Sequence, residues 1–481
     1  MTCRRPHSGR GEPAIAERRP NVILILTDDQ GPWAAGCCGN PEIRTPNINR
    51  LAENGLRFEN FFCTSPVCSP TRASLLTGRI PSQHGVHDFI RKGNMPPNPA
   101  AYTDAQKCYT DILAAHGWSC GLSGKWHLGD SLQPQHGFSH WVTMPHGASR
   151  YNDAEIIRDG RVETAPGYLT DVWTEEALRF IDGHRDEPFY LSLHYNAPHA
   201  PWRGHPEQIV ASYDDCPFES CPQEAAHPWV RPDLRDRLGD RESLKGYFAA
   251  VTALDAGVGR VLDRLEELGL REDTLVVFTS DNGFSCGHHG FWGKGNGTFP
   301  VNMYENSVKV PFIVSRPGSL PEGRVTPAMM SQYDFMPTLL NYLGLPAPED
   351  DALPGASFLP VWTGEADQGR DEVVVYDEYG PTRMIRTRRW KYVHRYPFGP
   401  HELYNLREDP GEQNNLWGEE VPDAAEDLRR RLARWFGRYA DPALDGARGP
   451  VTGWGQVAKI DRDHPLEGAF AGDVSDFLAP D

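Results

Sequence analysis

The chain has 481 residues, 39% of them hydrophobic and 10% aromatic, which is enough apolar material for a sizeable buried core. At roughly 150 residues per domain this length exceeds one ordinary domain, and we expect about two. The formal net charge of −18 argues against a general electrostatic attraction to nucleic acid or to an anionic membrane, so an anionic substrate would need a local cluster of basic residues or a metal ion.

Residues 1–20 are rich in arginine but lack the apolar segment of a secretory signal, and no apolar run is long enough to span a membrane. We therefore expect a disordered leader over residues 1–20 and a cytoplasmic protein without a membrane partner. The ten cysteines show neither a CxxC pair nor the Cys/His spacing of a zinc site. We favour mostly reduced thiols over a disulfide framework.

The first predicted core strand, residues 21–27, is a nearly continuous apolar run of the kind found where both faces of a sheet are buried. Similar runs and two amphipathic helical patterns follow: strands over 189–194 and 275–280, and helices over 172–181 and 244–268. Strands that alternate with helices predict an α/β fold for residues 21–365, with a large mixed, mostly parallel sheet between helices. Functional sites of such folds lie at the carboxyl ends of the strands.

The pattern changes after a Pro-, Gly- and acid-rich stretch over 345–355, and we place a domain boundary near residue 366. The expected smaller C-terminal α+β domain, 366–440, has short antiparallel strands over 373–376 and 382–394 and an amphipathic helix over 422–439. The tail over 441–481 has weak periodicity, and we expect it to wrap a surface.

A basic cluster lies in the smaller domain: Arg383, Arg386, Arg388, Arg389 and Lys391. These side chains either rim a pocket for an anionic glycan or lie on a solvated strand face. We favour the solvated face.

Acidic pairs follow two of the predicted strands. Asp28 and Asp29 end the first strand, and Asp281 and Asn282 follow the strand over 275–280. Asp and Asn are also common at strand ends because they start turns, but two such pairs favour a shared site. Their oxygen ligands suit calcium or magnesium better than zinc.

Cys68 is the candidate nucleophile. Ser69 can cap a helix, Pro70 suits its first turn and Gly78 can end it, so we expect Cys68 at a helix N-terminus, where N–H groups favour an anion. Arg72 falls on the same face one turn along, where its guanidinium could hold both the nucleophile and an anionic group. The alternative is a buried structural thiol beside a surface arginine.

The run Cys68-Ser69-Pro70-Thr71-Arg72 resembles the Cys-x-Pro-x-Arg signature of type I sulfatases, which have the alkaline-phosphatase-like fold. In that family a separate maturation enzyme oxidises the cysteine to formylglycine. The resemblance leaves out only the leader and the last forty or so residues. It extends over Asn21–Gln30, Ser65–Gly78 with Arg79 and His84-Gly85, Gly124-Lys125-Trp126-His127-Leu128-Gly129, Ala197-Pro198-His199, Asp281-Asn282-Gly283 and His401–Leu416.

The resemblance implies a role for each site residue. Asp28, Asp29, Asp281 and Asn282 would bind a divalent cation, usually Ca²⁺ with Mg²⁺ as the alternative, alongside an oxygen of formylglycine 68. Arg72 and Lys125 would steady the aldehyde hydrate and the sulfate, His127 and His199 would move protons, and Lys294 would contact the transferring group. Because Lys125 and His127 are two residues apart, an extended backbone would point both to one side.

Residues 287–298 are richer in His and Gly than the commoner family patterns. His288 and His289 either line a substrate subsite or belong to a mobile loop, and the sequence does not decide between these alternatives.

The implied reaction uses both hydroxyls of the hydrated aldehyde. One hydroxyl, with Asp281 as base, attacks sulfur, and His199 with Lys294 protonates the leaving alkoxide. The second hydroxyl, deprotonated by His127, then expels sulfate and restores the aldehyde. Serine has a single hydroxyl and could not perform this last step.

We therefore expect a sulfuric ester hydrolase, a sulfatase acting on a sulfated carbohydrate or a related alcohol. One alternative is a formylglycine-dependent phosphonate monoester or phosphodiester hydrolase, in which the second acidic pair is typically Asp-His. Another is a non-catalytic glycan-binding protein that keeps Cys68 as a thiol, although it would bury many charges without purpose. The sequence leaves open the identity of the substrate, endo or exo action and the oligomeric state.

Overall fold

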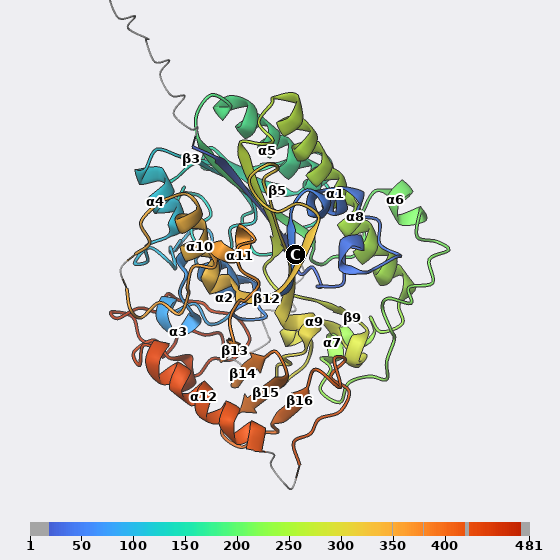
Figure 1. Ribbon diagram of the computed structural model, residues 1–481, viewed down its shortest axis with the longest axis vertical. Helices are drawn as coiled ribbons and strands as arrows, with labels where there is room; N and C mark the ends of the chain where they lie inside the picture. The colour runs from blue at the N-terminus through green and yellow to red at the C-terminus, as the bar shows by residue number, and fades with distance from the viewer. Residues whose placement is uncertain (1–18, 349, 379, 419–422, 473–481) are drawn as a thin grey trace, which may run out of the picture.

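A mixed sheet of ten strands forms the centre of the protein, in the order β12-β2-β11-β8-β1-β7-β3-β4-β5-β6 (Figure 1). The computed structural model describes residues 19–348, 350–378, 380–418 and 423–472. The strands of this sheet are β1 (Asn21–Asp28), β2 (Leu56–Phe62), β3 (Ser119–Gly124), β4 (Phe138–Thr143), β5 (Glu155–Arg158), β6 (Arg161–Thr164), β7 (Phe189–Pro198), β8 (Thr274–Ser280), β11 (Lys309–Ser315) and β12 (Arg324–Ser331).

Strand β1 lies at the middle of the sheet and pairs in parallel with β7 on one side and β8 on the other. All of its residues are buried. Leu24 and Leu26 belong to the core on one face, and Ile23 and Ile25 belong to the core on the other face. A strand covered on both faces needs apolar side chains at successive positions, which explains the continuous apolar run.

Helices cover both faces of the sheet, as the sequence predicts (Figure 1). One face packs on α1 (Pro46–Glu53), α5 (Leu169–His184) and α8 (Arg241–Glu267). The other packs on α2 (Cys68–Thr77), α4 (Tyr109–Ala115) and α10 (Phe335–Tyr342). Short elements complete this part: α3 (Pro81–His84), α6 (Glu207–Ala211), α7 (Pro232–Arg235), α9 (Glu305–Val308), α11 (Leu359–Trp362), and the paired strands β9 (Ser285–Cys286) and β10 (Trp292–Gly293).

The predicted smaller sheet is also present. It has four antiparallel strands, β13 (Glu372–Asp377), β14 (Thr382–Thr387), β15 (Trp390–Arg395) and β16 (Glu402–Asn405), beside helix α12 (Asp423–Tyr439). One of its faces packs on α12, whereas Val373 and Val375 on the other face join the core of the large sheet. The two sheets therefore share a hydrophobic core, and the boundary at residue 366 remains a prediction.

The described part of the C-terminal tail packs against the segment that follows α3. Gln456 forms an isolated bridge with Ile90, and its side chain is fully buried. Most of the predicted leader, residue 422 at the start of the predicted helix, and residues 473–481 of the tail lie outside the described residues. The nine cysteines within the described ranges are all free, and no helix there has the length and apolar character needed to cross a membrane.

Candidate active site

The carboxyl ends of β1 and β8 bring the two predicted acidic pairs together. One oxygen from each of Asp28, Asp29 and Asp281 lies within 4.8 Å of the others, and all three residues are buried. Asn282 Nδ2 donates to Asp29 Oδ1 at 2.8 Å, while Asn282 Oδ1 is buried without a hydrogen-bond partner among the described residues. Three carboxylates and an unsatisfied amide oxygen fit a hard divalent cation such as calcium or magnesium.

Each carboxylate also has a basic partner. Lys125 Nζ donates to Asp28 Oδ2 at 2.5 Å, and Lys294 Nζ donates to Asp29 Oδ1 at 2.6 Å. Burial alone would raise the pKa of Asp28, but the neighbouring cations, Lys125 above all, lower it to about 2. Asp28 is therefore ionised, and Lys125 and Lys294 each balance the charge of the carboxylate that they contact.

Cys68 is the first residue of α2, as predicted, and lies against this cluster. Its Sγ is 3.4 Å from Asp28 Oδ1 and 2.7 Å from Lys294 Nζ. Burial, followed by the charge of Asp28, raises the pKa of the thiol to about 12. An unmodified Cys68 is therefore a neutral thiol at physiological pH and a poor nucleophile.

The expected cap of this helix is wrong. Val67 occupies the N-cap position without a side-chain hydrogen bond, and Ser69 lies inside the helix. Ser69 Oγ instead donates to the His127 carbonyl at 2.9 Å and accepts from the Ile90 backbone N–H at 3.0 Å. Gly78 ends the helix in the left-handed region, as expected.

Arg72 holds the carboxylates rather than the sulfur of Cys68. Its Nε and Nη2 lie 3.0 and 2.9 Å from Asp281 Oδ2, and its Nη1 donates to the Lys125 carbonyl at 3.1 Å. The predicted fork between the nucleophile and an anionic group does not describe these contacts, because Nε and Nη2 approach the same oxygen of Asp281 and Nη1 holds the backbone of Lys125.

His127 is positioned differently from the prediction. Its φ of 59° is left-handed, so the extended backbone expected from Lys125 to His127 is wrong, although both residues line the same cavity. His127 Nε2 lies 3.0 Å from the Ile90 carbonyl, which can only accept, so Nε2 carries the proton. Nδ1 has no hydrogen-bond partner among the described residues. Burial, followed by Lys125, holds the pKa of His127 well below its usual range, which leaves a neutral ring with a free lone pair.

His199 follows β7 and approaches the carboxylates from another side. Its Nδ1 is 3.0 Å from the Ala200 carbonyl, so by the same reasoning Nδ1 carries a proton. Its Nε2 is 3.8 Å from Asp29 Oδ2. His127 thus presents Nδ1 for proton transfer, whereas His199 presents Nε2.

These side chains meet in a cavity of about 440 Å³ lined by Asp29, Cys68, Lys125, His127, His199 and Lys294. Its walls include residues that the sequence interpretation missed: Phe89, Ile90, Arg91, His146 and Arg231. These residues are scattered over loops, and no motif in the sequence marks them.

His288 and His289 do not line this cavity. His288 Nε2 is 3.0 Å from the Ser220 carbonyl, and the ring of His289 stacks on Tyr304 with 3.8 Å between centroids. These contacts do not support the subsite alternative, and both rings are packed against the protein.

Neither alternative for the basic cluster holds for Arg386 and Lys391. Lys391 is fully buried, and its Nζ lies 2.7 Å from Glu305 Oε1 and 2.6 Å from Glu412 Oε1. Arg386 is 8% exposed and lies 3.3 Å from Glu305 Oε2. These two residues form an internal ion network beneath the smaller sheet.

Comparison with known proteins gives matches over most of the chain. The family model described as sulfatase matches residues 20–345, and the model described as N-sulphoglucosamine sulphohydrolase, C-terminal, matches residues 287–436. An N-acetylglucosamine-6-O-sulfatase of Bacteroides thetaiotaomicron is 27% identical over 88% of this chain and 87% of its own length. The N-acetylgalactosamine-6-sulfatase of Homo sapiens is 31% identical over 77% of this chain and 70% of its own length.

Solved structures are similar over most of the chain as well. One, in complex with its substrate D-glucosamine-2-N,6-O-disulfate, has a TM-score of 0.76 and 25% identity and covers 90% of this chain and 100% of its own. The phosphonate monoester hydrolase of Agrobacterium radiobacter has a TM-score of 0.65 at 22% identity, over 88% of this chain and 96% of its own. At this low identity, the similarity to the phosphonate monoester hydrolase shows a shared fold and nothing further.

Proposed function

Since the chain belongs to the sulfatase family, we propose that it hydrolyses the sulfate ester of a sulfated carbohydrate, with a 6-O-sulfated N-acetylhexosamine as the first substrate to test. The observation that carries this proposal is the position of Cys68 Sγ, 3.4 Å from Asp28 within the cluster of buried carboxylates. Two of the relatives are named as 6-sulfatases of N-acetylhexosamines, which supports the choice of substrate.

The proposal includes formylglycine at position 68, produced by a maturation enzyme, and a divalent cation. Asp28, Asp29, Asp281 and Asn282 would hold the cation, and their oxygen donors favour Ca²⁺ with Mg²⁺ as the alternative. The bound cation would supply positive charge next to the sulfuryl oxygens. The neutral thiol of Cys68 agrees with a reactive group other than the cysteine itself.

The proton-transfer roles follow from the ring nitrogens. His127 Nδ1, which has a free lone pair, would remove the proton that allows sulfate to be expelled. Lys294 Nζ would protonate the leaving oxygen, and His199 could assist only through a proton on Nε2, because its Nδ1 proton is held by the Ala200 carbonyl. Lys125 would offset charge on the sulfuryl group. Asp281 accepts hydrogen bonds from Arg72 and from the backbone N–H groups of Asp29 and Asn282, which disfavours it as the base.

The test is sulfate release by protein co-expressed with a formylglycine-generating enzyme, with mass analysis of the peptide that contains residue 68. We expect an aldehyde in place of the thiol and sulfate release from N-acetylglucosamine-6-sulfate or N-acetylgalactosamine-6-sulfate. An unmodified thiol in protein from its own host would instead favour the non-catalytic alternative.

The phosphonate or phosphodiester hydrolase alternative is tested with nitrophenyl sulfate against phenyl phosphonate and phosphodiester analogues. Asn282 stands where those enzymes typically have histidine, so we expect the sulfate to be the better substrate. Greater efficiency on the phosphorus compounds would overturn this ranking. The cytoplasmic location remains a prediction, and detection of the protein in a secreted fraction would contradict it.

A further inference from the structure

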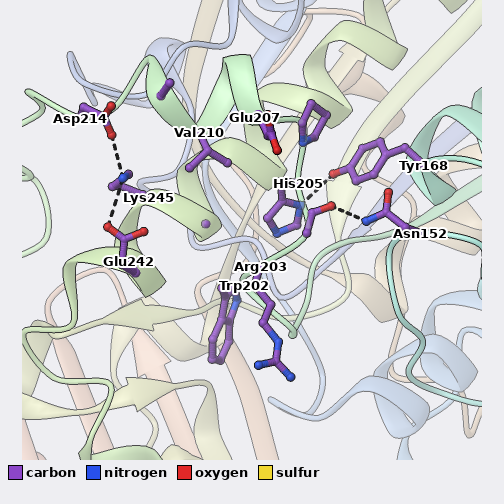
Figure 2. A pocket seen from close by; sticks show the side chains of 14 residues that line it. Asn152, Tyr168, Trp202, Arg203, His205, Glu207, Val210, Asp214, Glu242 and Lys245 are labelled. Carbon is purple, nitrogen blue, oxygen red and sulfur yellow. Dashed lines mark hydrogen bonds and ion pairs between the residues drawn. The ribbon is translucent and has the colours of Figure 1, made fainter.

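A second and larger cavity, of about 820 Å³, adjoins the one that contains Cys68. Figure 2 shows the side chains that line this second cavity. Trp202 lines both cavities, so the two meet at a single side chain. Trp202 Nε1 donates to the Pro198 carbonyl at 3.1 Å, and its ring packs edge-on against Trp292 with 5.0 Å between centroids. These contacts make Trp202 a fixed partition between the two cavities.

The second cavity is built from elements that are distant in sequence. Tyr168 lies just before α5, residues 202–211 follow β7 and include α6, and α8 contributes Lys245 and Gly246. A Cβ added at Gly246 would lie 2.0 Å from the Trp202 carbonyl oxygen, which shows how closely α8 supports the Trp202 backbone. The cavity is therefore held on two sides by helices of the large domain.

One wall of this cavity presents groups suited to hydroxyls. The Tyr168 hydroxyl and His205 Nδ1 are 2.9 Å apart, and Asn152 Nδ2 donates to the Gly204 carbonyl at 2.6 Å (Figure 2). His205 is 5% exposed, and its Nε2 is buried without a hydrogen-bond partner among the described residues. Tyr168 is half-buried, so it is the member of this pair that a bound ligand can contact.

The charges of the walls disfavour a second anionic group. Lys245 Nζ lies between Asp214 Oδ1 at 2.7 Å and Glu242 Oε1 at 3.1 Å, as Figure 2 shows, so its charge is already balanced. Glu207 adds a further negative charge. Arg203 is exposed and has no ion pair with any described residue, so its guanidinium is available to donate hydrogen bonds.

We propose that the second cavity binds an uncharged sugar unit that is glycosidically joined to the sulfated unit beside Cys68. The proposal rests on the sulfatase function proposed above and narrows its substrate to a sulfated disaccharide or longer oligosaccharide. Trp202 would present its ring at the glycosidic junction. Arg203 and Tyr168 would contact hydroxyls of the neighbouring sugar, and His205 would hold the Tyr168 hydroxyl in place.

The test compares kcat/KM for N-acetylglucosamine-6-sulfate with that for a disaccharide in which the same unit is joined to unsulfated galactose. We expect the disaccharide to be preferred roughly tenfold, the effect of about one good hydrogen bond in the transition state. Arg203→Ala and Tyr168→Phe should each remove most of this preference. Each should change kcat/KM for the monosaccharide by less than about twofold. Arg185→Ala, an exposed arginine near the end of α5, is the matched control.

Each other outcome has a definite meaning. Equal kcat/KM for the two substrates, or equal losses on both in Arg203→Ala, would overturn the second subsite while leaving the sulfatase function in place. A strong preference for a disaccharide that carries a second sulfate would overturn the assignment to an uncharged sugar. Absence of sulfate release from every substrate, with residue 68 matured, would instead contradict the proposed function itself.

Discussion

Ile90 and Gln456 pair through their backbones as an isolated parallel bridge, and Ile90 also accepts the hydrogen bond of His127 Nε2 at 3.0 Å. Gln456 Oε1 accepts from the His87 N–H, and Gln456 Nε2 donates to the Gly85 carbonyl, each at 2.9 Å. The tail, which neither family model covers, thus fixes the loop that orients the histidine beside Cys68.

Replacement of Gln456 by alanine tests this positioning role. Gln456→Ala should lower kcat by roughly tenfold or more with little change in KM, because a displaced Ile90 carbonyl would no longer fix the tautomer and angle of His127. Steady-state kinetics and the pH dependence of kcat are the measurements. The control, Gln413→Ala, removes an exposed glutamine and should change neither kcat nor KM. A lowered melting temperature with unchanged kcat would mean that the tail is only structural.

Removal of the divalent cation should destabilise the protein. The carboxylates of Asp28, Asp29 and Asp281 repel one another, and Asn282 Oδ1 lacks a partner, so a bound cation would relieve both penalties. A hundredfold excess of Ca²⁺ over its dissociation constant should raise the free energy of unfolding by about 2.7 kcal/mol. Thermal unfolding in calcium and after chelation measures the effect without any substrate.

The matched variants for the cation experiment are Asn282→Ala at the site and Asn414→Ala on the surface. Asn282→Ala should reduce the calcium-dependent rise in melting temperature, whereas Asn414→Ala should retain it. If calcium stabilises Asn282→Ala as strongly as the parent protein, Asn282 is not a ligand. If neither calcium nor magnesium shifts the melting temperature, the cluster is not a cation site.

The sequence predicts the site through its strands. Continuous apolar runs identify β1 and β8 as buried, and parallel strands end at the same edge of a sheet, so Asp28, Asp29, Asp281 and Asn282 had to converge there. The turn residue Gly78 likewise predicts the end of the helix that begins at Cys68.

The remaining features depend on tertiary packing, which local patterns do not encode. The left-handed backbone of His127 accompanies a hydrogen bond to Ile90, and the buried Lys391 is paired with two glutamates on other segments. Trp202 is an ordinary loop tryptophan in the sequence. It becomes a partition only because α8 and β10 pack around it.

The buried ion network predicts a stability effect at Lys391. Lys391→Met would leave Glu305 and Glu412 buried without their shared cation, which should cost about 3–5 kcal/mol of the free energy of unfolding. Denaturant unfolding measures this loss. Arg389→Met, an exposed change in the turn that precedes β15, is the control. Intact stability with a raised KM for an anionic glycan would instead restore the hypothesis that this cluster rims a substrate pocket.

A last prediction concerns pH and the buried carboxyl of Asp88, next to the wall of the catalytic cavity. Burial raises the pKa of Asp88 from 3.8 to about 7, although the N–H groups of Gly455 and Phe89 oppose the shift. Between about pH 4 and pH 7 the unfolded chain has lost this proton and the folded protein keeps it. The contribution of Asp88 to stability should therefore fall as pH rises, by at most about 1.4 kcal/mol per pH unit, and level off above pH 7.

Asp88→Asn separates this contribution from those of other buried acids such as Glu378, whose pKa burial also raises to about 7. The amide does not titrate and can still accept one of the two backbone N–H groups that Asp88 binds, from Phe89 at 2.7 Å and Gly455 at 3.0 Å. The variant should therefore become more stable relative to the parent as the pH rises from 5 to 7, as measured by the difference between their free energies of unfolding. A difference that stays constant over this range would show that Asp88 is ionised in the folded protein.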